Sequence, residues 1–218
     1  MAIISQQYKH IIWDWNGTLL DDKWLCIESI NSLLKDRNLP LIDEDKYQEI
    51  FTFPVKDYYA RAGFDFTLEP FEVPAMQFIA LYDRKKHLCF LQAQAMNVIS
   101  QLHARGCRQY LLSASETGIL TWMAEFHGIR KYFSKIKGLD NHYAHGKVEH
   151  GIELLSQINS EPGSVVMIGD TCHDEEVAFQ MGIPCILFTG GHYPAQRLKS
   201  CSSLLIDGLS DLIQEDQD

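Results

Sequence analysis

Short runs of apolar residues alternate along the chain with longer stretches in which apolar positions recur at helical spacing. The short runs predict buried β-strands, and the longer stretches predict amphipathic helices. One such helical face contains Leu91, Ala95, Val98, Ile99 and Leu102. Strands are expected at 9–14, 108–113, 132–138, 164–169, 185–188 and 203–206. Strands separated by helices are typical of a doubly wound parallel sheet, so the expected fold class is α/β.

The first strand is followed by a long segment without strand patterning. Helical patterns lie at 23–37, 43–51, 55–62 and 74–86, and they are interrupted by Pro40, Pro54, Gly63 and Pro70. Proline and glycine at these points are expected to end the helices. The sequence therefore predicts two parts: an α/β core formed by residues 1–19 and 91–218, and an α-helical subdomain inserted at 20–90.

Composition narrows the class of protein. The 218 residues are 46% hydrophobic and 22% charged, which is ordinary for a globular protein. The formal net charge of -10 argues against nucleic acid as the main partner. No apolar run approaches the roughly 20 residues of a membrane span, and the N-terminus lacks a signal-peptide pattern. We expect a cytoplasmic protein without a membrane partner, and the sequence does not indicate an oligomeric state.

The six cysteines are scattered and form no C-x-x-C pair. A chain of this size needs no disulfide framework to fold. We therefore expect reduced thiols, and we interpret Cys172 as a packed and inert one.

Polar residues gather after four of the predicted elements. They are Asp14-Trp15-Asn16-Gly17-Thr18 after the first strand, Ser113-Ala114-Ser115 after the second, Lys147 at the start of a helix, and Gly169-Asp170-Thr171-Cys172-His173-Asp174 after the fourth strand. Ligands of open α/β sheets bind at the carboxyl ends of the strands. The four clusters are therefore expected to form one site.

The residue types in these clusters suit phosphate chemistry. Carboxylates at buried strand ends need a cation, and the oxygen ligands of Asp14 and Asp170 suit Mg²⁺. Gly17 allows a tight turn in which backbone N–H groups face an anion. Ser113 offers a hydroxyl and Lys147 a positive charge to phosphate oxygens. An aspartate in this position can attack phosphorus and form an aspartyl-phosphate.

These four clusters resemble the four motifs of the haloacid dehalogenase superfamily. The matching segments are Ile11–Leu19, Leu111–Ser115, Gly146–Glu149 and Val165–Ala178. The predicted helical insertion matches the position of the cap in phosphoglycolate-phosphatase-like members. The resemblance extends over nearly the whole chain and implies a phosphatase that acts on a small phosphorylated metabolite with Mg²⁺ as cofactor.

The resemblance also implies a role for each residue. Asp14 would be the nucleophile and a metal ligand, and Asn16 would offer its backbone carbonyl to the metal. Asp170 would bind the metal, and Asp174 would support it directly or through water. Ser113 and Lys147 would hold the transferred phosphoryl group. The phosphate-binding loops would be completed by Gly17, Thr18 and Ala114.

Asn16 departs from the family pattern. Phosphatases of this family usually carry aspartate there, as the group that protonates the leaving oxygen and then activates water. An amide cannot shuttle a proton, and general acid–base catalysis is worth roughly 10²- to 10⁴-fold. Two alternatives stay open, and Asn16 motivates the second of them. One is a dehalogenase, phosphonatase or mutase on the same scaffold, and the other is a phosphate-binding or regulatory protein with impaired turnover.

Four histidines and one lysine are further candidates for a functional group. The candidates to replace the missing acid are His142, His145, His173 and His192, and we interpret all four as surface or loop-packing residues. Lys56, in the helical insertion, is interpreted as a solvated lysine rather than as the imine-forming amine of phosphonate-cleaving relatives.

Overall fold

The computed structural model describes residues 4–139, 146–161 and 163–214. The chain divides into two compact units. The first contains Met1–Leu20 together with Leu91–Asp218, and the second contains Asp21–Phe90. The chain passes between them at the short strands β2 (Leu20–Asp21) and β3 (Phe90–Leu91), which form a two-stranded sheet.

A six-stranded sheet in the order β5-β4-β1-β6-β7-β8 forms the centre of the first unit, and its strand pairs are parallel. The strands are β1 (His10–Trp13), β4 (Arg108–Glu116), β5 (Phe133–Leu139), β6 (Val165–Gly169), β7 (Cys185–Phe188) and β8 (Leu204–Ile206). The predicted fold class is confirmed. The largest difference is at β4, which continues three residues beyond Ser113, its predicted end.

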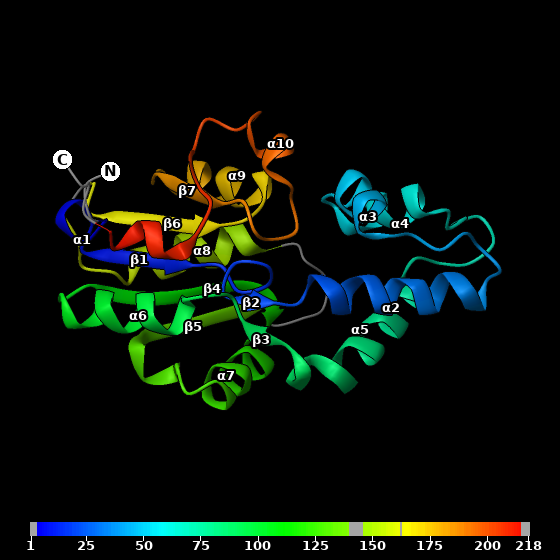
Figure 1. Ribbon diagram of the computed structural model, residues 1–218, viewed down its shortest axis with the longest axis horizontal. Helices are drawn as coiled ribbons and strands as arrows, with labels where there is room; N and C mark the ends of the chain where they lie inside the picture. Colours follow the sequence, from blue (N-terminus) through cyan, green and yellow to red (C-terminus); the bar gives the residue numbers. More distant parts are fainter. Residues whose placement is uncertain (1–3, 140–145, 162, 215–218) are drawn as a thin grey trace. The chain divides into compact units, whose positions relative to one another are not determined.

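Helices cover both faces of this sheet (Figure 1). Helices α6 (Ala95–Ala104) and α7 (Thr117–Phe126) lie on one face, and α8 (Lys147–Ser156) and α9 (Cys172–Met181) lie on the other. The short helices α1 (Ile4–Gln7) and α10 (Ala195–Leu198) and the 3₁₀ turns η2 (Arg130–Tyr132) and η3 (Leu209–Leu212) complete the unit. Because both faces are covered, the central strands are apolar on both sides, as in the fully buried Ile11 and Ile12.

The strand order reverses beside β1. The chain moves from β1 outward to β4 and β5, then returns to the other side of β1 to form β6, β7 and β8. Such a reversal opens a crevice at the carboxyl ends of the two strands where it occurs. Residues that follow β1 and β6 are therefore placed at the usual ligand site of an open α/β sheet.

The second unit is helical. Its helices are α2 (Lys23–Asp36), α3 (Glu44–Ile50), α4 (Val55–Ala62) and α5 (Glu72–Lys85), followed by the 3₁₀ turn η1 (Lys86–Leu88). Asp43 caps α3 by accepting a hydrogen bond from the Lys46 backbone N–H, and Gly63 ends α4 in the left-handed conformation. The core of the unit consists of Ile30, Leu33, Leu34, Ile42, Tyr47, Ile50, Tyr58, Tyr59, Ala62 and Phe64.

Cys172 and Cys201 form a disulfide. The expectation that every cysteine is a reduced thiol is therefore wrong for this pair. Sequence spacing gave no indication of the bond, because 29 positions separate the two residues and the fold alone brings them together. The remaining cysteines, Cys26, Cys89, Cys107 and Cys185, are free thiols.

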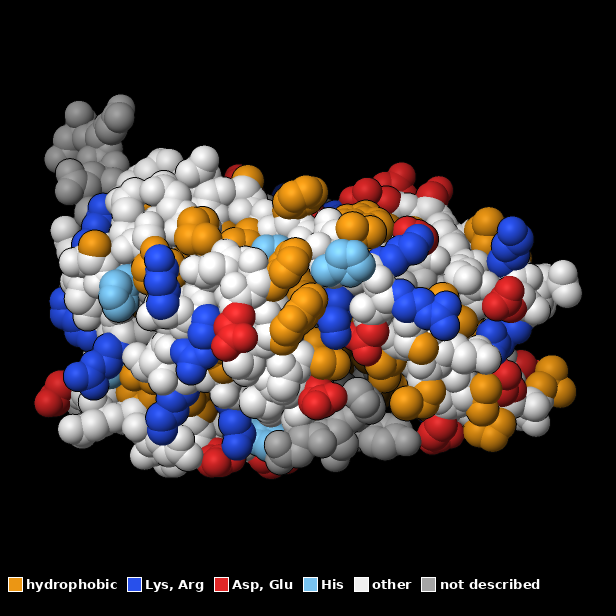
Figure 2. Space-filling model, turned by 90° about the horizontal axis from the view of Figure 1, so that it is seen from below, with side chains coloured by type: hydrophobic (Ala, Val, Ile, Leu, Met, Phe, Trp, Pro, Cys, Tyr) orange, Lys and Arg blue, Asp and Glu red, His pale blue; other side chains and the backbone are white. Residues whose placement is uncertain are grey.

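Apolar side chains on the face shown in Figure 2 are interspersed with charged ones. Larger exposed apolar residues include the stacked pair Trp122 and Phe126 on α7. Among the described helices, none combines the length and the apolar character that a membrane span requires.

Candidate active site

Asp14 lies directly after β1, where its backbone N–H still bonds to the carbonyl of Ile168 on β6. The strand is buried along its whole length, and it carries the Asp14 side chain into the interior with only 6% of its surface exposed. A buried carboxylate needs a positive or hydrogen-bonding partner. The next elements of the sheet supply these partners.

Lys147 is the principal partner of Asp14. It is the first residue of α8, it is buried, and its Nζ atom lies 2.5 Å from Asp14 Oδ1 and 2.6 Å from Asp174 Oδ1. The single ammonium group therefore bridges carboxylates from two segments of the sheet. In this way Lys147 brings together Asp14, which is 133 positions before it, and Asp174, which is 27 positions after it.

Asp170 and Asp174 come from the β6–α9 connection. Asp174 forms a capping box with Thr171, in which its Oδ2 accepts the backbone N–H of Thr171 at 3.0 Å and the Thr171 hydroxyl at 2.7 Å. Asp170 accepts the Thr18 hydroxyl at 2.9 Å and the backbone N–H of His192 at 2.6 Å. Asp170 is thus held by hydrogen bonds from two other segments, and Asp174 by hydrogen bonds within its own connection.

Two glycines allow these loops to approach Asp170. A Cβ atom on Gly17 would lie 2.3 Å from Asp170 Oδ2, and one on Gly191 would lie 2.2 Å from the same oxygen. Gly17 also has a φ of +75°, which favours glycine. The requirement for glycine at position 17 therefore comes both from backbone conformation and from the carboxylate packed against it.

Burial dominates the electrostatics of the cluster. It raises the pKa of Asp14 to about 7, with Lys147 opposing the rise and the other two carboxylates adding to it. Burial also raises the pKa of Asp170 to about 6, against the influence of His192. Burial acts in the same direction on Asp174, but Lys147 outweighs it and holds that pKa below its usual value. Burial acts to lower the pKa of Lys147, and Asp14 and Asp174 raise it above its usual value.

The donor set fits a divalent cation. Asp14, Asp170 and Asp174 each offer a carboxylate oxygen, and these oxygens all lie within 4.8 Å of one another. Lys147 pairs with Asp14 and Asp174 but not with Asp170, and Asp14 and Asp170 have raised pKa values, so a further positive charge would stabilise the ionised forms. Hard oxygen donors of this kind suit Mg²⁺ more than a soft metal.

The second strand-end cluster lies beside Asn16. The Ser115 hydroxyl donates to Asn16 Oδ1 at 2.9 Å, and the buried Ser113 hydroxyl lies 3.5 Å from the same atom. Ser113 Oγ also accepts the backbone N–H of Ser115 at 3.0 Å. The half-buried Ala114 lies between them on β4. Both serines thus present hydroxyl donors to the amide oxygen of Asn16.

Some contacts were not foreseen from the sequence. Thr18, predicted to line the phosphate site, directs its hydroxyl to Asp170 and, at 3.3 Å, to Asp14. His192, predicted to be a surface or loop-packing residue, is buried beside Asp170. The glycine pair before His192 was the available sequence signal, because it marks a close approach of the backbone. Ser115 was part of a predicted cluster, but its bond to Asn16 depends on the extra length of β4.

The other histidines and Lys56 lie in varied settings. His173 pairs with Glu176 on α9 at 3.2 Å. His142 and His145 lie outside the described residues. Lys56, in the helical unit, is exposed and places its Nζ atom 5.5 Å from the centre of the Phe66 ring.

The same arrangement of segments is found in known proteins. The family model described as haloacid dehalogenase-like hydrolase matches residues 11–188, from within β1 to the end of β7. The chain belongs to this family. The resemblance expected from the four motifs is thereby confirmed, and the chain is a haloacid dehalogenase-like hydrolase.

Individual relatives agree with this assignment over almost their full length. The chain is 24% identical over 209 residues to a phosphoglycolate phosphatase of Synechococcus elongatus, covering 94% of this chain and 95% of the relative. A haloacid dehalogenase-like family hydrolase of Streptococcus pneumoniae has a similar structure, with a TM-score of 0.81, 19% identity and 95% and 97% of the two chains covered. A protein described as a predicted phosphoglycolate phosphatase of Haemophilus somnus has a TM-score of 0.76 at 23% identity, with 94% and 96% covered.

Proposed function

We propose that the chain is a Mg²⁺-dependent phosphatase that transfers the phosphoryl group of a small phosphorylated metabolite to Asp14 and then to water. The observation that carries this proposal is the buried cluster of Asp14, Asp170 and Asp174 around Lys147, at the carboxyl ends of β1 and β6. The family and the phosphatases among the relatives support the same reaction class.

In the first half-reaction, a carboxylate oxygen of Asp14 attacks phosphorus, and the bond to the leaving oxygen breaks. Lys147 has three N–H groups, and its partners among the described residues, Asp14 and Asp174, take two of them. The third would bind a phosphate oxygen, and the Ser113 hydroxyl would bind another. Phosphate binding also involves Gly17, Thr18 and Ala114, through the loop that follows β1 and the end of β4.

Mg²⁺ would be held by Asp14, Asp170 and the backbone carbonyl of Asn16, with Asp174 in direct or water-mediated support. It would supply positive charge that reduces the repulsion between Asp14 and the phosphate. In the second half-reaction, water attacks the aspartyl-phosphate, releases inorganic phosphate and restores the Asp14 carboxylate.

Asn16 sets a limit on the substrate. Its amide can orient water or a substrate oxygen, but it cannot give or take a proton at neutral pH. A leaving group that departs without protonation is affected least, so we propose acyl phosphates as the favoured class. The helical unit, Asp21–Phe90, would act as the cap that excludes water and selects the metabolite.

The direct test is phosphate release from a panel of acyl phosphates and phosphate monoesters, with Mg²⁺ and with the metal removed by a chelator. We expect release that requires Mg²⁺ and is faster for the acyl phosphates. A preparation that releases no phosphate from any compound would contradict the proposal. Phosphate release that is unchanged by metal removal would contradict the Mg²⁺ dependence. Dehalogenase chemistry, which needs no such metal site, would instead appear as metal-independent release of halide from haloacids, without phosphate release.

The second candidate function is phosphate binding with little turnover, and Asn16 is the observation that favours it. The Asn16→Asp variant separates the two. A gain of about 10²-fold or more on monoesters, the range of general acid–base catalysis, would show that the native residue limits proton delivery. If wild type and variant both bind phosphate compounds and neither turns them over, the binding function is favoured.

A further inference from the structure

The Cys172–Cys201 pair lies beside the carboxylate cluster without belonging to it. Cys172 is the first residue of α9 and lies two positions from both Asp170 and Asp174. Cys201 follows α10 and precedes β8. The Cα atoms of the pair are 6.2 Å apart, a separation within the usual range for a disulfide. The bond therefore ties the start of α9 to the segment before β8.

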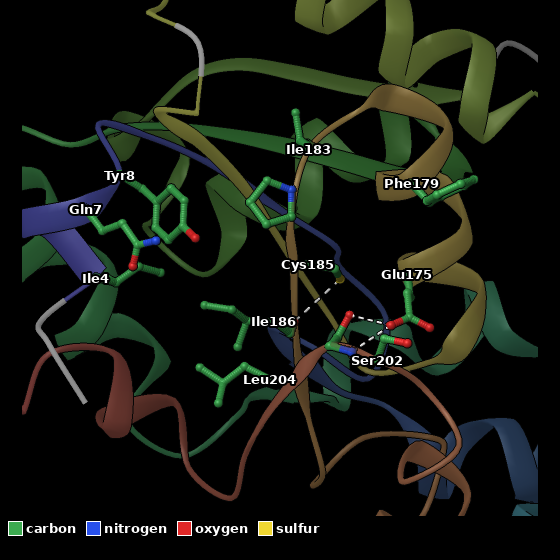
Figure 3. A pocket seen from close by; sticks show the side chains of 12 residues that line it. Ile4, Gln7, Tyr8, Glu175, Phe179, Ile183, Cys185, Ile186, Ser202 and Leu204 are labelled. Atoms are coloured by element: carbon green, nitrogen blue, oxygen red, sulfur yellow. Dashed lines mark hydrogen bonds between the residues drawn. The ribbon is translucent and has the colours of Figure 1, made fainter.

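A second link joins the same two segments. Glu175, on the first turn of α9, accepts the backbone N–H and the hydroxyl of Ser203, both at 2.7 Å. Glu175 and Ser202 line a pocket of about 420 Å³ on this side of the sheet (Figure 3). The start of α9 is thus fastened at two neighbouring points, and of these two links the disulfide alone responds to redox conditions.

The start of α9 also determines where Asp174 lies. Asp174 is the third residue of the helix, and it holds Thr171 through the capping box while accepting a hydrogen bond from Lys147. A shift of the first helical turn would move this carboxylate relative to Asp170 and Asp14. The position of Cys172 makes its bond to Cys201 a constraint on the whole cluster.

The two cysteines are also less buried than most of the free thiols. Cys172 and Cys201 are each half-buried, whereas Cys89, Cys107 and Cys185 are buried. Cys185 lines the same pocket as Ser202 and Ser203, and its burial limits its access to solvent.

We propose that Cys172 and Cys201 form a reversible redox site that fastens the start of α9 when oxidised and loosens it when reduced. The oxidant would be a small-molecule disulfide such as oxidised glutathione. One cysteine thiolate attacks a sulfur of this reagent, expels one thiolate and forms a mixed disulfide. The second cysteine thiolate then attacks the protein sulfur and expels the other thiolate. The two protons lost by the cysteines are balanced by the two thiol equivalents released.

Oxidation would therefore slow the local opening of α9 and tighten the metal site. The effect on Mg²⁺ rests on the proposed function, whereas bond formation and the fastening of α9 do not. We expect the Mg²⁺ affinity of the oxidised protein to be about fivefold higher than that of the reduced protein, at the low end of typical coupling between sites.

The experiment compares the full chain after treatment with oxidised glutathione and after treatment with dithiothreitol. Mass spectrometry of unreduced peptides should find the Cys172–Cys201 crosslink in the first sample and two free thiols in the second. Hydrogen exchange of the first turns of α9 should be slower in the oxidised protein, by about tenfold if local opening is restricted. Calorimetric titration with Mg²⁺ alone, without substrate, measures the change in affinity.

Three variants serve as controls. Cys172→Ser and Cys201→Ser should each abolish the redox response of hydrogen exchange and of Mg²⁺ binding. Two separate single variants are used so that the test still stands if one of them misfolds. Cys26→Ser removes a half-buried thiol of the helical unit and should leave the response intact.

The proposal is overturned if both cysteines stay free under oxidising conditions, or if the crosslink forms and hydrogen exchange of α9 does not change. Equal Mg²⁺ affinity of the oxidised and reduced proteins would contradict the proposed effect of the disulfide on the metal site. If Mg²⁺ binds in neither state, the proposed function fails, and the crosslink and hydrogen exchange still decide the redox site.

Discussion

The buried strand-end cluster of the sheet-containing unit differs in kind from the aromatic part of the helical unit's core. At the strand ends, four ionisable side chains are buried together: Asp14, Lys147, Asp170 and Asp174. In the helical unit, aromatic rings that include Tyr58 pack together with aliphatic side chains in the core. The Tyr58 ring meets those of Tyr47, Phe51 and Tyr59 edge-on, at centroid distances of 5.7, 5.2 and 5.6 Å. The strand-end cluster is held by ion pairs and hydrogen bonds, and the aromatic rings by packing.

The two regions contribute differently to the stability of the fold and to its chemistry. Burying charged groups is costly even when they are paired, so such a cluster is weak support for stability and a strong indication of chemistry. Aromatic packing stabilises the fold directly and says little about reaction type. Removing a carboxylate from the first region should therefore lower activity without lowering stability, whereas removing its single ammonium should also destabilise the fold. Substitutions in the second region should affect stability first.

The largest effect is expected for Asp14→Asn. Loss of a nucleophile commonly lowers turnover by about 10⁴-fold or more. Folding should be preserved or improved, because burial and two like charges already disfavour the ionised carboxylate. The measurements are phosphate release and thermal unfolding without metal. Turnover within tenfold of wild type would remove Asp14 from the mechanism, and a large loss of stability would make the cluster a structural feature.

Lys147→Met should give the next largest effect, this time on stability. The substitution leaves Asp14 and Asp174 buried without their ammonium partner, and breaking a buried ion pair costs about 3–5 kcal/mol. Urea unfolding without metal measures the loss.

The matched control is Lys46→Met, which removes the exposed i,i+3 pair with Glu49 in the helical unit. An exposed pair of this kind contributes at most about 1 kcal/mol. If the two variants lost similar free energy of unfolding, the ion pairs of Lys147 would contribute no more to stability than a surface ion pair does.

The sequence was sufficient to place much of the sheet-containing unit. Strand β7 was predicted at its observed bounds, and β1 and β6 to within one residue at each end, because short apolar runs buried on both faces are easily recognised. The convergence of Asp14, Lys147, Asp170 and Asp174 followed from a general property of parallel sheets, whose carboxyl ends share one edge. The individual hydrogen bonds did not follow, since they depend on loop paths such as the approach of Gly191 to Asp170.

Contacts between segments far apart in the chain could not be predicted from the sequence. The Cys172–Cys201 bond depends on where α10 turns back toward α9. The burial of His192 depends on the path of the segment between β7 and α10, for which the glycine pair before His192 is the one local signal. In the helical unit, α4 was predicted at its observed bounds because Pro54 and Gly63 mark both ends. The packing of its tyrosines against neighbouring helices was not predictable from spacing alone.

Two tyrosines of the helical unit allow a finer test of the comparison. The Tyr82 hydroxyl donates to the carboxylate of Asp22 at 2.7 Å. Tyr82→Phe should lower the free energy of unfolding by about 1.5–3 kcal/mol, the usual contribution of a hydrogen bond to a charged group. Urea unfolding measures the change. No loss would mean that the aromatic interior tolerates removal of its polar contacts, which would sharpen its contrast with the carboxylate cluster.

Tyr58→Phe should have the smallest effect. Among the described residues, the buried Tyr58 hydroxyl has no hydrogen-bond partner, and such a group costs free energy when it is removed from water. The variant keeps the ring that packs edge-on against Phe51 and Tyr59 while it removes the unsatisfied oxygen. We expect stability in urea to be unchanged or to increase by up to about 1 kcal/mol. A clear loss would mean that the hydroxyl binds a buried water, and the interior of the helical unit would then depend on hydrogen bonding as the carboxylate cluster does.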